Sequence, residues 1–579
     1  MTSTFKTKLR DLACGEINSS LIGKRIAIAG WVRKIRNHGG ILFIDIRDRT
    51  GVVQVIVNPE DENLNSMVKT LKKEFVIQVF GLVRKRPNDQ INKSMKTGEV
   101  EVLAEKINVL NPSDETPIEV KDDVVITEKN RFKYRYLDLR RPKIQKNILF
   151  RHEVVKAVRD FLNSKNFVEI ETPLLVKSTP EGARDFLVPS RMHKGKFYAL
   201  PQSPQLYKQL LMIAGFDRYY QIVKCLRDED LRADRQPEFT QIDLEMSFVD
   251  QEDVMNLTES LIKYVVEKTL GLELNEPFQR MTYDEAMDKY GSDKPDLRFG
   301  LELEDVKDAV KILNLRIFEA EAVKALRVDA LFSRKKIKEF ENIVKLYKAR
   351  GLAWISLKDG SVSGSLSKFA TDEFLKRINL KEGETIFIVA GDKSIVNTSL
   401  GQLRLALGKE LNLINEDEFK FLWVTDFPMF EYDDEEKRLV AQHHPFTKPE
   451  VVSEELEKHP LSVKALAYDI VLNGWELGGG SIRIENIDLQ RRIFKLIGLS
   501  DEEAEKKFGF LLEALRYGAP PHGGLAIGLD RLATLLSKQT DIREFIAFPK
   551  NKSAENPMDG SPSEVDPRQL EELGISIRK

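Results

Sequence analysis

The stretch from Tyr220 to Asp243 carries residues whose types and spacing are suited to chemistry. Two strand-like runs are joined by a charged loop, with Arg227 ending the first run and Phe239 opening the second. Strand alternation gives the second run an apolar face and a polar face, with Ile242, Leu244 and Met246 on the first and Phe239, Gln241 and Asp243 on the second. A ring beside an amide and a carboxylate, opposite an arginine, suits a stacked planar base with an anionic group nearby. An ordinary amphipathic hairpin is the alternative.

A second candidate lies at residues 468–484, where an apolar run is broken at Asn473-Gly474 and followed by three consecutive glycines. Asp469 and Glu476 are seven residues apart, so a regular strand puts them on opposite faces unless a bulge at Asn473-Gly474 shifts the phase. With that bulge the two carboxylates could share a hard cation, and nucleotide phosphates would complete the usual ligand set of Mg²⁺. Arg483 lies between two isoleucines and needs an anionic partner. That partner could be either a structural carboxylate or a bound ligand.

Three further signals are weaker when taken alone. At residues 523–536 a glycine-rich strand runs into an apolar helix with Arg531 at the junction, and Gly524 and Gly528 leave room for a planar ligand. Gln205 and Lys208 fall three apart and could share a helix face, although a solvated helix is the simpler interpretation. A His443-His444 pair precedes a proline.

Composition and missing motifs exclude several classes of protein. The 579 residues exceed one core, and a net charge of −2 gives no global signal for nucleic acid or membrane. The chain lacks GxxxxGK[ST], GxGxxG, GxSxG and HExxH, so a nucleotide must bind by another route. The two cysteines exclude a disulfide framework and a CxxC metal site, and no long uncharged apolar run is present. We expect a soluble, intracellular, cytoplasmic protein with no membrane partner.

The elements that would position these residues follow from periodicity. Residues 25–110 hold five short β-branched runs separated by turn signals, which predicts a small barrel. Phe43 has the parity of the outer, polar face, beside Gln54 and the basic stretch containing Arg36, the layout with which oligonucleotide-binding barrels stack unpaired bases. A Phe covered by a loop is the alternative. Residues 129–146 are strongly basic, which suits either a polyphosphate contact or a solvated hinge.

The rest of the chain divides by composition. From Ile148 helical spacing predicts a long helix, followed by an edge strand that ends at Pro173. Residues 286–420 contain neither histidine nor cysteine, and we expect an inserted α+β module without chemistry of its own. The predicted domains are a barrel (1–110), a linker (111–135), a first core part (136–285), the insert (286–420), a second core part (421–555) and a C-terminal extension (556–579).

Together these segments resemble the three signature motifs of class II aminoacyl-tRNA synthetases. The helix and strand ending at Pro173 match the first motif, Tyr220 to Asp243 the second, and Gly524 to Arg531 the third. SPQLYKQLLM, HHPFT and GGGSIRI are similar to the bacterial aspartyl members of class IIb. Ala526 and Asp530 depart mildly from the class pattern. The resemblance implies an α+β fold with an antiparallel-sheet catalytic core, an N-terminal OB-fold barrel that binds the anticodon, a GAD-type insert, and a homodimer.

The resemblance also implies residue roles. Arg227, Glu476 and Arg531 would be catalytic, with Asp469 and Glu476 binding Mg²⁺. The residues implied for ATP are Arg227, Asp228, Glu229, Gln236, Phe239, Glu476, Gly528, Leu529, Asp530 and Arg531. Those implied for aspartate are Glu181, Gln205, Lys208, Arg227, Asp243, His443 and Arg483, with Lys208 and Arg483 on the side-chain carboxylate. Those implied for the anticodon are Arg36, His38, Phe43 and Gln54.

The implied activity is an aspartate–tRNA ligase that uses ATP and Mg²⁺. It would form aspartyl-adenylate and pyrophosphate and then charge tRNA(Asp). His38 is similar to a histidine of members that also charge tRNA(Asn). We therefore expect an enzyme that charges both tRNA(Asp) and tRNA(Asn), with strict specificity for tRNA(Asp) as the alternative. A sister enzyme for asparagine or lysine and a catalytically inactive paralogue are disfavoured by the large insert and by the presence of Arg227, Glu476 and Arg531.

Overall fold

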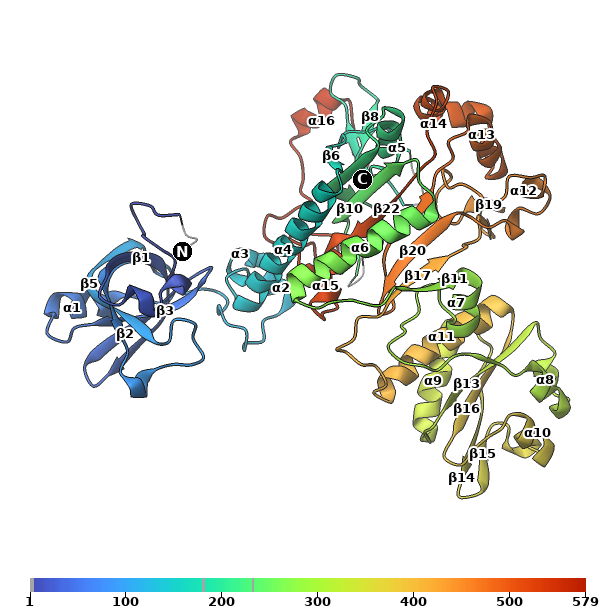
Figure 1. The fold of residues 1–579 in the computed structure, drawn as a ribbon, viewed down its shortest axis with the longest axis horizontal. Helices are drawn as coiled ribbons and strands as arrows, with labels where there is room; N and C mark the ends of the chain where they lie inside the picture. The colour runs from blue at the N-terminus through green and yellow to red at the C-terminus, as the bar shows by residue number, and fades with distance from the viewer. Residues whose placement is uncertain (1–4, 180–182, 232–233, 579) are drawn as a thin grey trace. The chain divides into compact units, whose positions relative to one another are not determined.

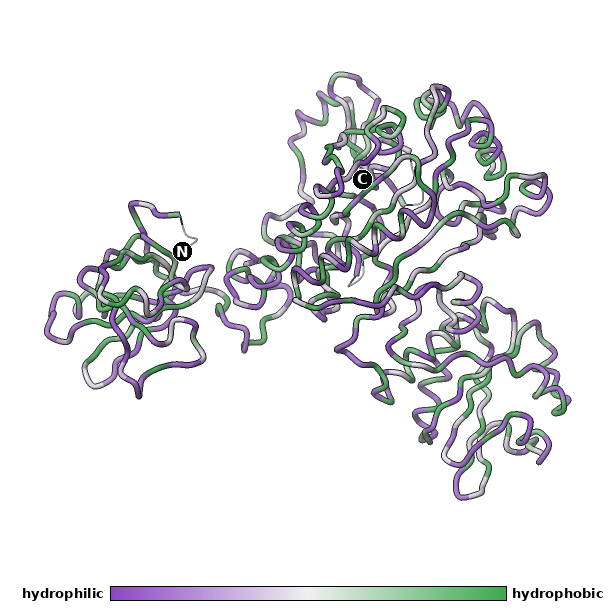
Figure 2. Tube along the Cα trace, in the orientation of Figure 1, coloured by the Kyte–Doolittle hydropathy of each residue, from purple (hydrophilic) through white to green (hydrophobic). Residues whose placement is uncertain are grey.

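The computed structural model describes residues 5–179, 183–231 and 234–578, which form two compact units. The first comprises 1–146 with 556–561, and the second 147–555 with 562–579. Figure 1 shows the fold of each unit, and Figure 2 the hydrophobic residues along their strands and helices. Among the described residues, no helix has the length and hydropathy needed to cross a bilayer. The divisions of the chain into domains remain proposals.

The first unit is built on a closed barrel, in the order β1-β2-β3-β5-β4. Its strands are β1 (Arg25–His38), β2 (Ile41–Asp48), β3 (Gly51–Val57), β4 (Val76–Lys85) and β5 (Val100–Asn111), with α1 (Glu62–Thr70) between β3 and β4. Leu42, Ile44 and Ile46 alternate into the core, as their parity predicts, because strand residues point to opposite faces in turn. The five-stranded barrel is therefore confirmed.

The basic run after the barrel has a use that the sequence does not reveal. It forms α2 (Glu128–Lys133) and α3 (Arg135–Asp138), where Asp138 is fully buried. Three arginines bind its carboxylate, Arg131 at 3.0 Å, Arg135 at 2.5 Å and Arg141 at 3.0 Å. These three side chains of the run therefore pair with one acidic centre within the first unit, a role that the sequence analysis did not consider.

The second unit contains an eight-stranded sheet in the order β11-β17-β20-β21-β22-β10-β9-β6. Its strands are β6 (Val168–Glu169), β9 (Arg218–Leu226), β10 (Glu238–Ser247), β11 (Gln279–Thr282), β17 (Phe421–Thr425), β20 (Ala467–Leu472), β21 (Trp475–Ile482) and β22 (His522–Gly528). Only the β6–β9 and β11–β17 pairs are parallel within this described sheet. The expected antiparallel core is confirmed.

Helices cover both faces of this sheet. One core joins the sheet to α4 (Pro142–Ser164), α6 (Gln251–Leu270) and α15 (Leu529–Leu536), and a second joins it to α5 (Gln205–Ile213), α7 (Tyr283–Tyr290), α13 (Ile487–Leu496) and α14 (Asp501–Leu515). The long α6 starts at a capping box between Asp250 and Asp253 and ends at Gly271 in the left-handed region. The shorter elements are β7 (Leu187–Pro189), β8 (Phe197–Ala199), β18 (Phe430–Asp433), β19 (Arg438–Ala441), α12 (Glu455–Lys458) and α16 (Pro567–Leu573).

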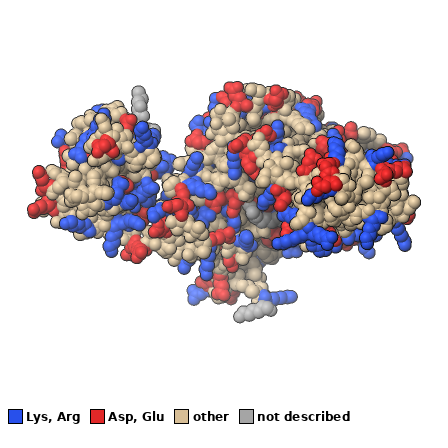
Figure 3. All heavy atoms as spheres, turned by 90° about the horizontal axis from the view of Figure 1, so that it is seen from below, with Lys and Arg blue, Asp and Glu red and all other residues tan. Residues whose placement is uncertain are grey.

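The inserted module has its own antiparallel sheet, β12-β13-β16-β14-β15. Its strands are β12 (Glu304–Asp305), β13 (Ala322–Val328), β14 (Ala353–Lys358), β15 (Ser361–Gly364) and β16 (Thr385–Gly391). One apolar cluster joins this sheet to α9 (Arg334–Leu346) and α11 (Lys393–Glu410), and another joins it to α8 (Lys307–Val310) and α10 (Asp372–Arg377). The module is an α+β sandwich, as expected. Figure 3 shows acidic and basic side chains interspersed on the face of the molecule in view.

Candidate active site

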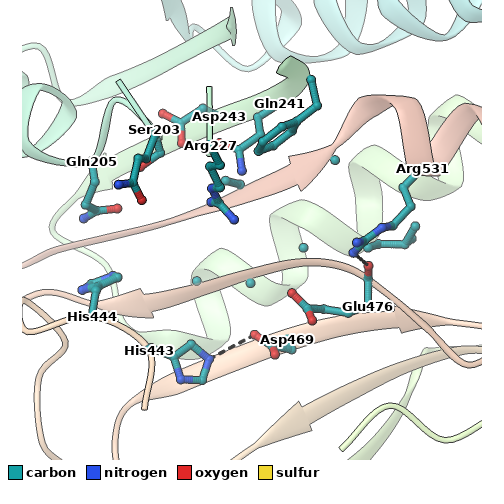
Figure 4. Close-up of a pocket in the computed structure, with 18 of the residues that line it drawn as sticks. Ser203, Gln205, Arg227, Gln241, Asp243, His443, His444, Asp469, Glu476 and Arg531 are labelled. Carbon is teal, nitrogen blue, oxygen red and sulfur yellow. Dashed lines mark hydrogen bonds and ion pairs between the residues drawn. The ribbon is translucent and has the colours of Figure 1, made fainter. Parts of the chain in front are cut away.

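A cavity of about 540 Å³ in the second unit collects most of the predicted site residues. Those lining it are Gln205, Lys208, Arg227, Glu229, Gln236, Phe239, Asp243, His443, Asp469, Glu476, Arg483, Gly528, Asp530 and Arg531. Asp228 and Leu529 are not part of its lining, and Glu181 falls outside the described residues. In Figure 4, Arg531 and Glu476 lie at one end of the cavity and Gln205 and His444 at the other. Segments distant in the sequence therefore meet at one polar site.

The floor of the cavity comes from β9 and β10, which pair in register. The guanidinium of Arg227 lies 5.2 Å from the centroid of the Phe239 ring, and Gln241 and Asp243 follow on the same face. The residues of β10 with the opposite parity, Ile242 and Leu244, are buried in the core. The alternation predicted for this strand is confirmed, and the ring and the arginine form one cationic and aromatic surface.

Two cations and two carboxylates form a buried network at the base of the cavity. Lys208 Nζ lies 2.7 Å from Asp243 Oδ1 and 3.4 Å from Glu245 Oε2. Arg483 donates to Glu245 through Nε at 2.9 Å and Nη2 at 3.2 Å. All four side chains are at most 2 % exposed. The solvated helix considered for Lys208 is therefore wrong, and Arg483 has the structural carboxylate that the sequence left open while still lining the cavity.

Glu245 is the residue of this network that the sequence analysis missed. It continues the alternation of Phe239, Gln241 and Asp243 by one more step, which is the signal that could have found it. Burial raises the pKa of Asp243. Burial acts in the same direction on Glu245, but Arg483 and Lys208 outweigh it and lower the pKa of that carboxyl. Glu245 is thus held as a carboxylate beneath the arginine.

The hairpin β20–β21 brings Asp469 and Glu476 to one face, although not in the predicted way. Asn473 and Gly474 both have positive φ values, 51° and 83°, and form the hairpin turn. The bulge lies beyond the turn, because Val471 pairs with Glu476 whereas Ile470 pairs with Gly478, which leaves Leu477 as the extra residue. The turn itself sets the face of Glu476, because this residue lies opposite Val471, and Val471 shares a face of β20 with Asp469. The predicted change of phase at Asn473-Gly474 is observed, but a hairpin turn produces it and not a bulge.

The two adjacent histidines have different partners. His443 Nε2 lies 3.2 Å from Asp469 Oδ1 (Figure 4). Burial lowers the pKa of His443, but the charge and hydrogen bond of Asp469 outweigh it and the pKa is raised. His444 Nε2 accepts a hydrogen bond from Arg483 Nη1 at 2.6 Å. Burial and the nearby Arg483 hold the pKa of His444 well below its ordinary value, so this ring is neutral. His444, which the sequence analysis did not assign, orients the arginine.

Four buried polar atoms at this cavity have no hydrogen-bond partner within the described part of the chain. They are Gln205 Nε2, Arg227 Nε, Asp243 Oδ2 and His443 Nδ1. Buried polar groups normally have partners, so each unpaired atom here marks a place where a ligand could bind. An amide, a guanidinium and a carboxylate together offer donors for an anionic group and an acceptor for an ammonium group.

Several residues of the motifs have structural roles. A Cβ at Gly524 would lie 2.0 Å from Glu245 Oε2, so this glycine makes room for Glu245 and not for a planar ligand. Asp530 accepts from Thr240 N at 2.8 Å and from Arg151 at 3.0 Å. Leu529 is buried in the core. The side-chain amide of Gln236 accepts from Lys550 N at 2.8 Å. These contacts position the second and third motifs.

For the ATP site that the resemblance implies, replacing Gly479 with alanine is expected to raise the KM for ATP about tenfold while the fold is retained. The new Cβ would lie 2.3 Å from Asp469 Oδ1 and would push aside a carboxylate that His443 also holds. Gly480→Ala is the contrasting control, because its Cβ would lie 2.1 Å from the backbone oxygen of Gly524 and should instead lower the melting temperature. Steady-state kinetics and thermal unfolding of both variants check this. An unchanged KM for ATP in Gly479→Ala contradicts it.

On the barrel, the predicted polar face is also observed. Arg36 Nη2 lies 2.6 Å from Asp45 Oδ1 and 3.0 Å from Gln54 Oε1. Phe43 is half-buried, and its ring centroid lies 6.5 Å from that of His38 in an edge-to-face arrangement. The exposed His38 and the half-buried Phe43 thus lie together at one end of the β1–β2 hairpin. A base could stack there.

Comparison with known proteins agrees with this geometry. Residues 127–552 match a family model described as class II tRNA synthetases (D, K and N), and residues 26–110 match an OB-fold nucleic acid binding domain. An aspartate–tRNA ligase of Ruminiclostridium cellulolyticum is 50 % identical over 98 % of both chains. An aspartate–tRNA(Asp/Asn) ligase of Caldanaerobacter subterraneus is 50 % identical over 97 % of this chain and 98 % of its own.

A solved asparaginyl-tRNA synthetase of Pyrococcus horikoshii, bound to asparaginyl-adenylate, has a similar fold. Its TM-score is 0.59 at 21 % identity, and the match covers 93 % of this chain and 97 % of that one. At this identity the likeness concerns the fold alone.

Proposed function

The chain belongs to the class II aminoacyl-tRNA synthetases as an aspartate–tRNA ligase, and on that premise we propose how its cavity performs the two steps of the reaction. The observation that carries the proposal is the set of unpaired polar atoms in one cavity. Asp243 Oδ2 would accept from the ammonium group of aspartate, while Arg227 Nε would donate to its α-carboxylate. Gln205 would assist with the ammonium group, as would Glu181.

Selectivity for aspartate would come from Lys208 and Arg483 at the base of the cavity. Both can contact a side-chain carboxylate, and both are already fixed by Asp243 and Glu245. An asparagine side chain offers no charge to these cations, so it would leave polar groups poorly paired, which is costly in a buried site. His443 would help to hold the substrate carboxylates.

ATP would lie across the other end of the cavity. Its adenine would stack between Phe239 and Arg531, with Glu229 on the adenosine side and Arg227 on the α-phosphate. Arg531 Nη1 donates to the backbone oxygen of Glu476 at 2.6 Å, which ties this arginine to the carboxylate pair. The nucleotide is thus held by aromatic and cationic groups without a glycine-rich phosphate loop.

In the first step the α-carboxylate oxygen of aspartate attacks the α-phosphorus, and the bond to the bridging oxygen of pyrophosphate breaks. The products are aspartyl-adenylate and pyrophosphate. No general base is needed, because the attacking carboxylate is already ionised, and Arg227 would stabilise the charge that develops. In the second step the terminal ribose hydroxyl of tRNA attacks the acyl carbon, and AMP leaves.

Asp469 and Glu476 would hold Mg²⁺ beside the phosphates. Within the described residues no group of three or more His, Cys, Asp and Glu side chains is arranged to bind a metal. Two carboxylates nevertheless suit Mg²⁺ when nucleotide oxygens complete its coordination, and Gly479 leaves the space in front of Asp469 open. The bound ion would neutralise phosphate charge.

We also propose a cytoplasmic homodimer. Strand β6 is the described edge of the large sheet, and nearby Val168, Leu174 and Leu175 are each about half exposed, at 45 %, 53 % and 51 %. An exposed apolar edge suits pairing with a second copy. The free, buried Cys14 and Cys225 support a reducing compartment.

The tRNA partner is expected to include tRNA(Asn) as well as tRNA(Asp). His38 lies beside Phe43, where an anticodon base would stack, and several relatives carry both acceptors in their names. The test is aminoacylation of purified tRNA(Asp) and tRNA(Asn) with labelled aspartate. His38→Ala should reduce charging of tRNA(Asn) more than that of tRNA(Asp), with aspartate-dependent ATP–pyrophosphate exchange unchanged.

Arg25→Ala on the same barrel is the control, because that side chain forms an exposed ion pair with Glu105 and is not one of the predicted anticodon residues. Failure of the wild type to charge tRNA(Asn) would show strict specificity. Failure to charge either tRNA would contradict the proposed function.

A further inference from the structure

The segment of residues 291–298, at the start of the predicted inserted module, reaches the catalytic cavity. Asp293 lines the cavity together with Asp469 and Glu476. The Nζ atom of the next residue, Lys294, lies 3.6 Å from Glu476 Oε2 and 3.6 Å from Asp293 Oδ1. A module expected to have no chemistry of its own therefore begins with a charged pair at the ATP end of the active site.

The inserted module holds this segment through Arg404 of α11. Arg404 is 1 % exposed, and its guanidinium donates to four carbonyl oxygens, those of Asp296, Phe299, Gly300 and Leu301. The same group lies 4.8 Å from the Tyr290 ring centroid and 4.1 Å from that of Phe299. Because one buried side chain satisfies these carbonyls, it fixes the path of the chain directly after Lys294.

Close backbone contacts fix the segment on both sides. Gly291 has a φ of +66°, and a Cβ there would lie 2.0 Å from the carbonyl oxygen of Asn397 in α11. On the opposite side, a Cβ at Gly474 in the β20–β21 turn would lie 3.1 Å from Asp296 Cβ. The segment is therefore held between a helix of the insert and the hairpin that carries Asp469 and Glu476.

The side chain of Lys294 is held much less firmly than its backbone. The Lys294 and Glu476 side chains are 44 % and 42 % exposed, and exposed ion pairs at 3.6 Å are weak. Lys294 can therefore leave Glu476 when a divalent cation binds that carboxylate. A weakly paired ammonium group beside a phosphate-binding end of a cavity is suited to a polyphosphate, whose oxygens it contacts as a compact charge.

We propose that Lys294 binds the β- and γ-phosphate end of ATP, the part that leaves as pyrophosphate, and that the inserted module positions it there through Arg404. This proposal rests on the proposed function and adds a residue to its ATP site. It also gives the insert a role in the first step of the reaction.

The test compares Lys294→Met with Lys289→Met, a matched change at an exposed lysine near the end of α7. For Lys294→Met, the KM for ATP and the KM for pyrophosphate in the reverse reaction should each rise about tenfold, as expected for a lost hydrogen bond to a charged group. The KM for aspartate should stay unchanged. Lys289→Met should behave as wild type.

Binding measurements separate phosphate contact from general damage. A sulfamoyl analogue of aspartyl-adenylate lacks the β- and γ-phosphates, so calorimetry should give the same affinity for wild type and Lys294→Met. Weaker binding of the analogue by Lys294→Met than by the wild type would overturn the proposal, and so would an unchanged affinity of this variant for ATP. If the wild type binds ATP but not the analogue, the proposed function fails, and the ATP affinities of the two lysine variants still decide the role of Lys294.

Arg404→Lys tests the positioning role. This variant should raise the KM for ATP in the wild-type background but not when Lys294 is already methionine, because both changes act through one contact. Fully additive effects would overturn the assignment to the insert.

Discussion

Arg483→Ala is expected to abolish aspartate-dependent ATP–pyrophosphate exchange. The variant removes one of the two cations available to the substrate side chain and leaves Glu245, which is fully buried, without its bidentate partner. Removing one member of a buried ion pair typically costs about 3–5 kcal/mol of stability, so the melting temperature should fall as well. Exchange assays and thermal unfolding measure the two effects.

A double variant separates binding from folding. Arg483→Met combined with Glu245→Gln removes both charges, and it should recover part of the lost stability without recovering exchange. The control is Arg492→Ala in α13, because that arginine pairs with Glu457 at the surface, where ion pairs contribute little. Normal affinity for aspartate in either Arg483 variant would refute the role of this arginine.

Asp138→Asn is expected to destabilise the first unit by about 3–5 kcal/mol, because three arginines would lose one buried carboxylate. Burial raises the pKa of Asp138, but the arginines outweigh it and lower the pKa below its ordinary value. A depressed folded-state pKa gives stability that is present above the unfolded-state pKa and is lost as the pH falls through the folded-state pKa. The variant should lose this acid-side dependence.

Thermal unfolding at neutral and acidic pH checks both parts of this prediction. Glu105→Gln is the control, because it removes an exposed carboxylate of the same unit whose pairing with Arg25 contributes little. A melting temperature for Asp138→Asn equal to that of Glu105→Gln would show that the arginines are satisfied elsewhere.

Local periodicity was enough to predict the elements that carry the site. The alternation in β10 correctly separated Phe239, Gln241 and Asp243 from the core positions. The five strands of the barrel and the α+β character of the insert were also predicted correctly. These are short-range properties, because the side-chain periodicity of a strand or helix can be recognised from residues that are close in the sequence.

The partners of charged residues could not be predicted in the same way. The sequence left Arg483 with two possible anionic partners, and Glu245, 238 residues away, was found only in the fold. Asp293 belongs to a module predicted to lack chemistry, yet it lines the catalytic cavity. Such contacts depend on which strands pair, which no local pattern encodes.

The sequence by itself determined the family motifs, the strand faces and the identities of most groups in the cavity. Tertiary structure alone decided their geometry: the pairing of Glu476 with Val471 that puts Glu476 on the face of Asp469, the carboxylates that fix Lys208 and Arg483, and the approach of Lys294 to Glu476. The physical reason is that a one-residue shift in strand register reverses a side chain's face, and register is set by pairing between distant segments.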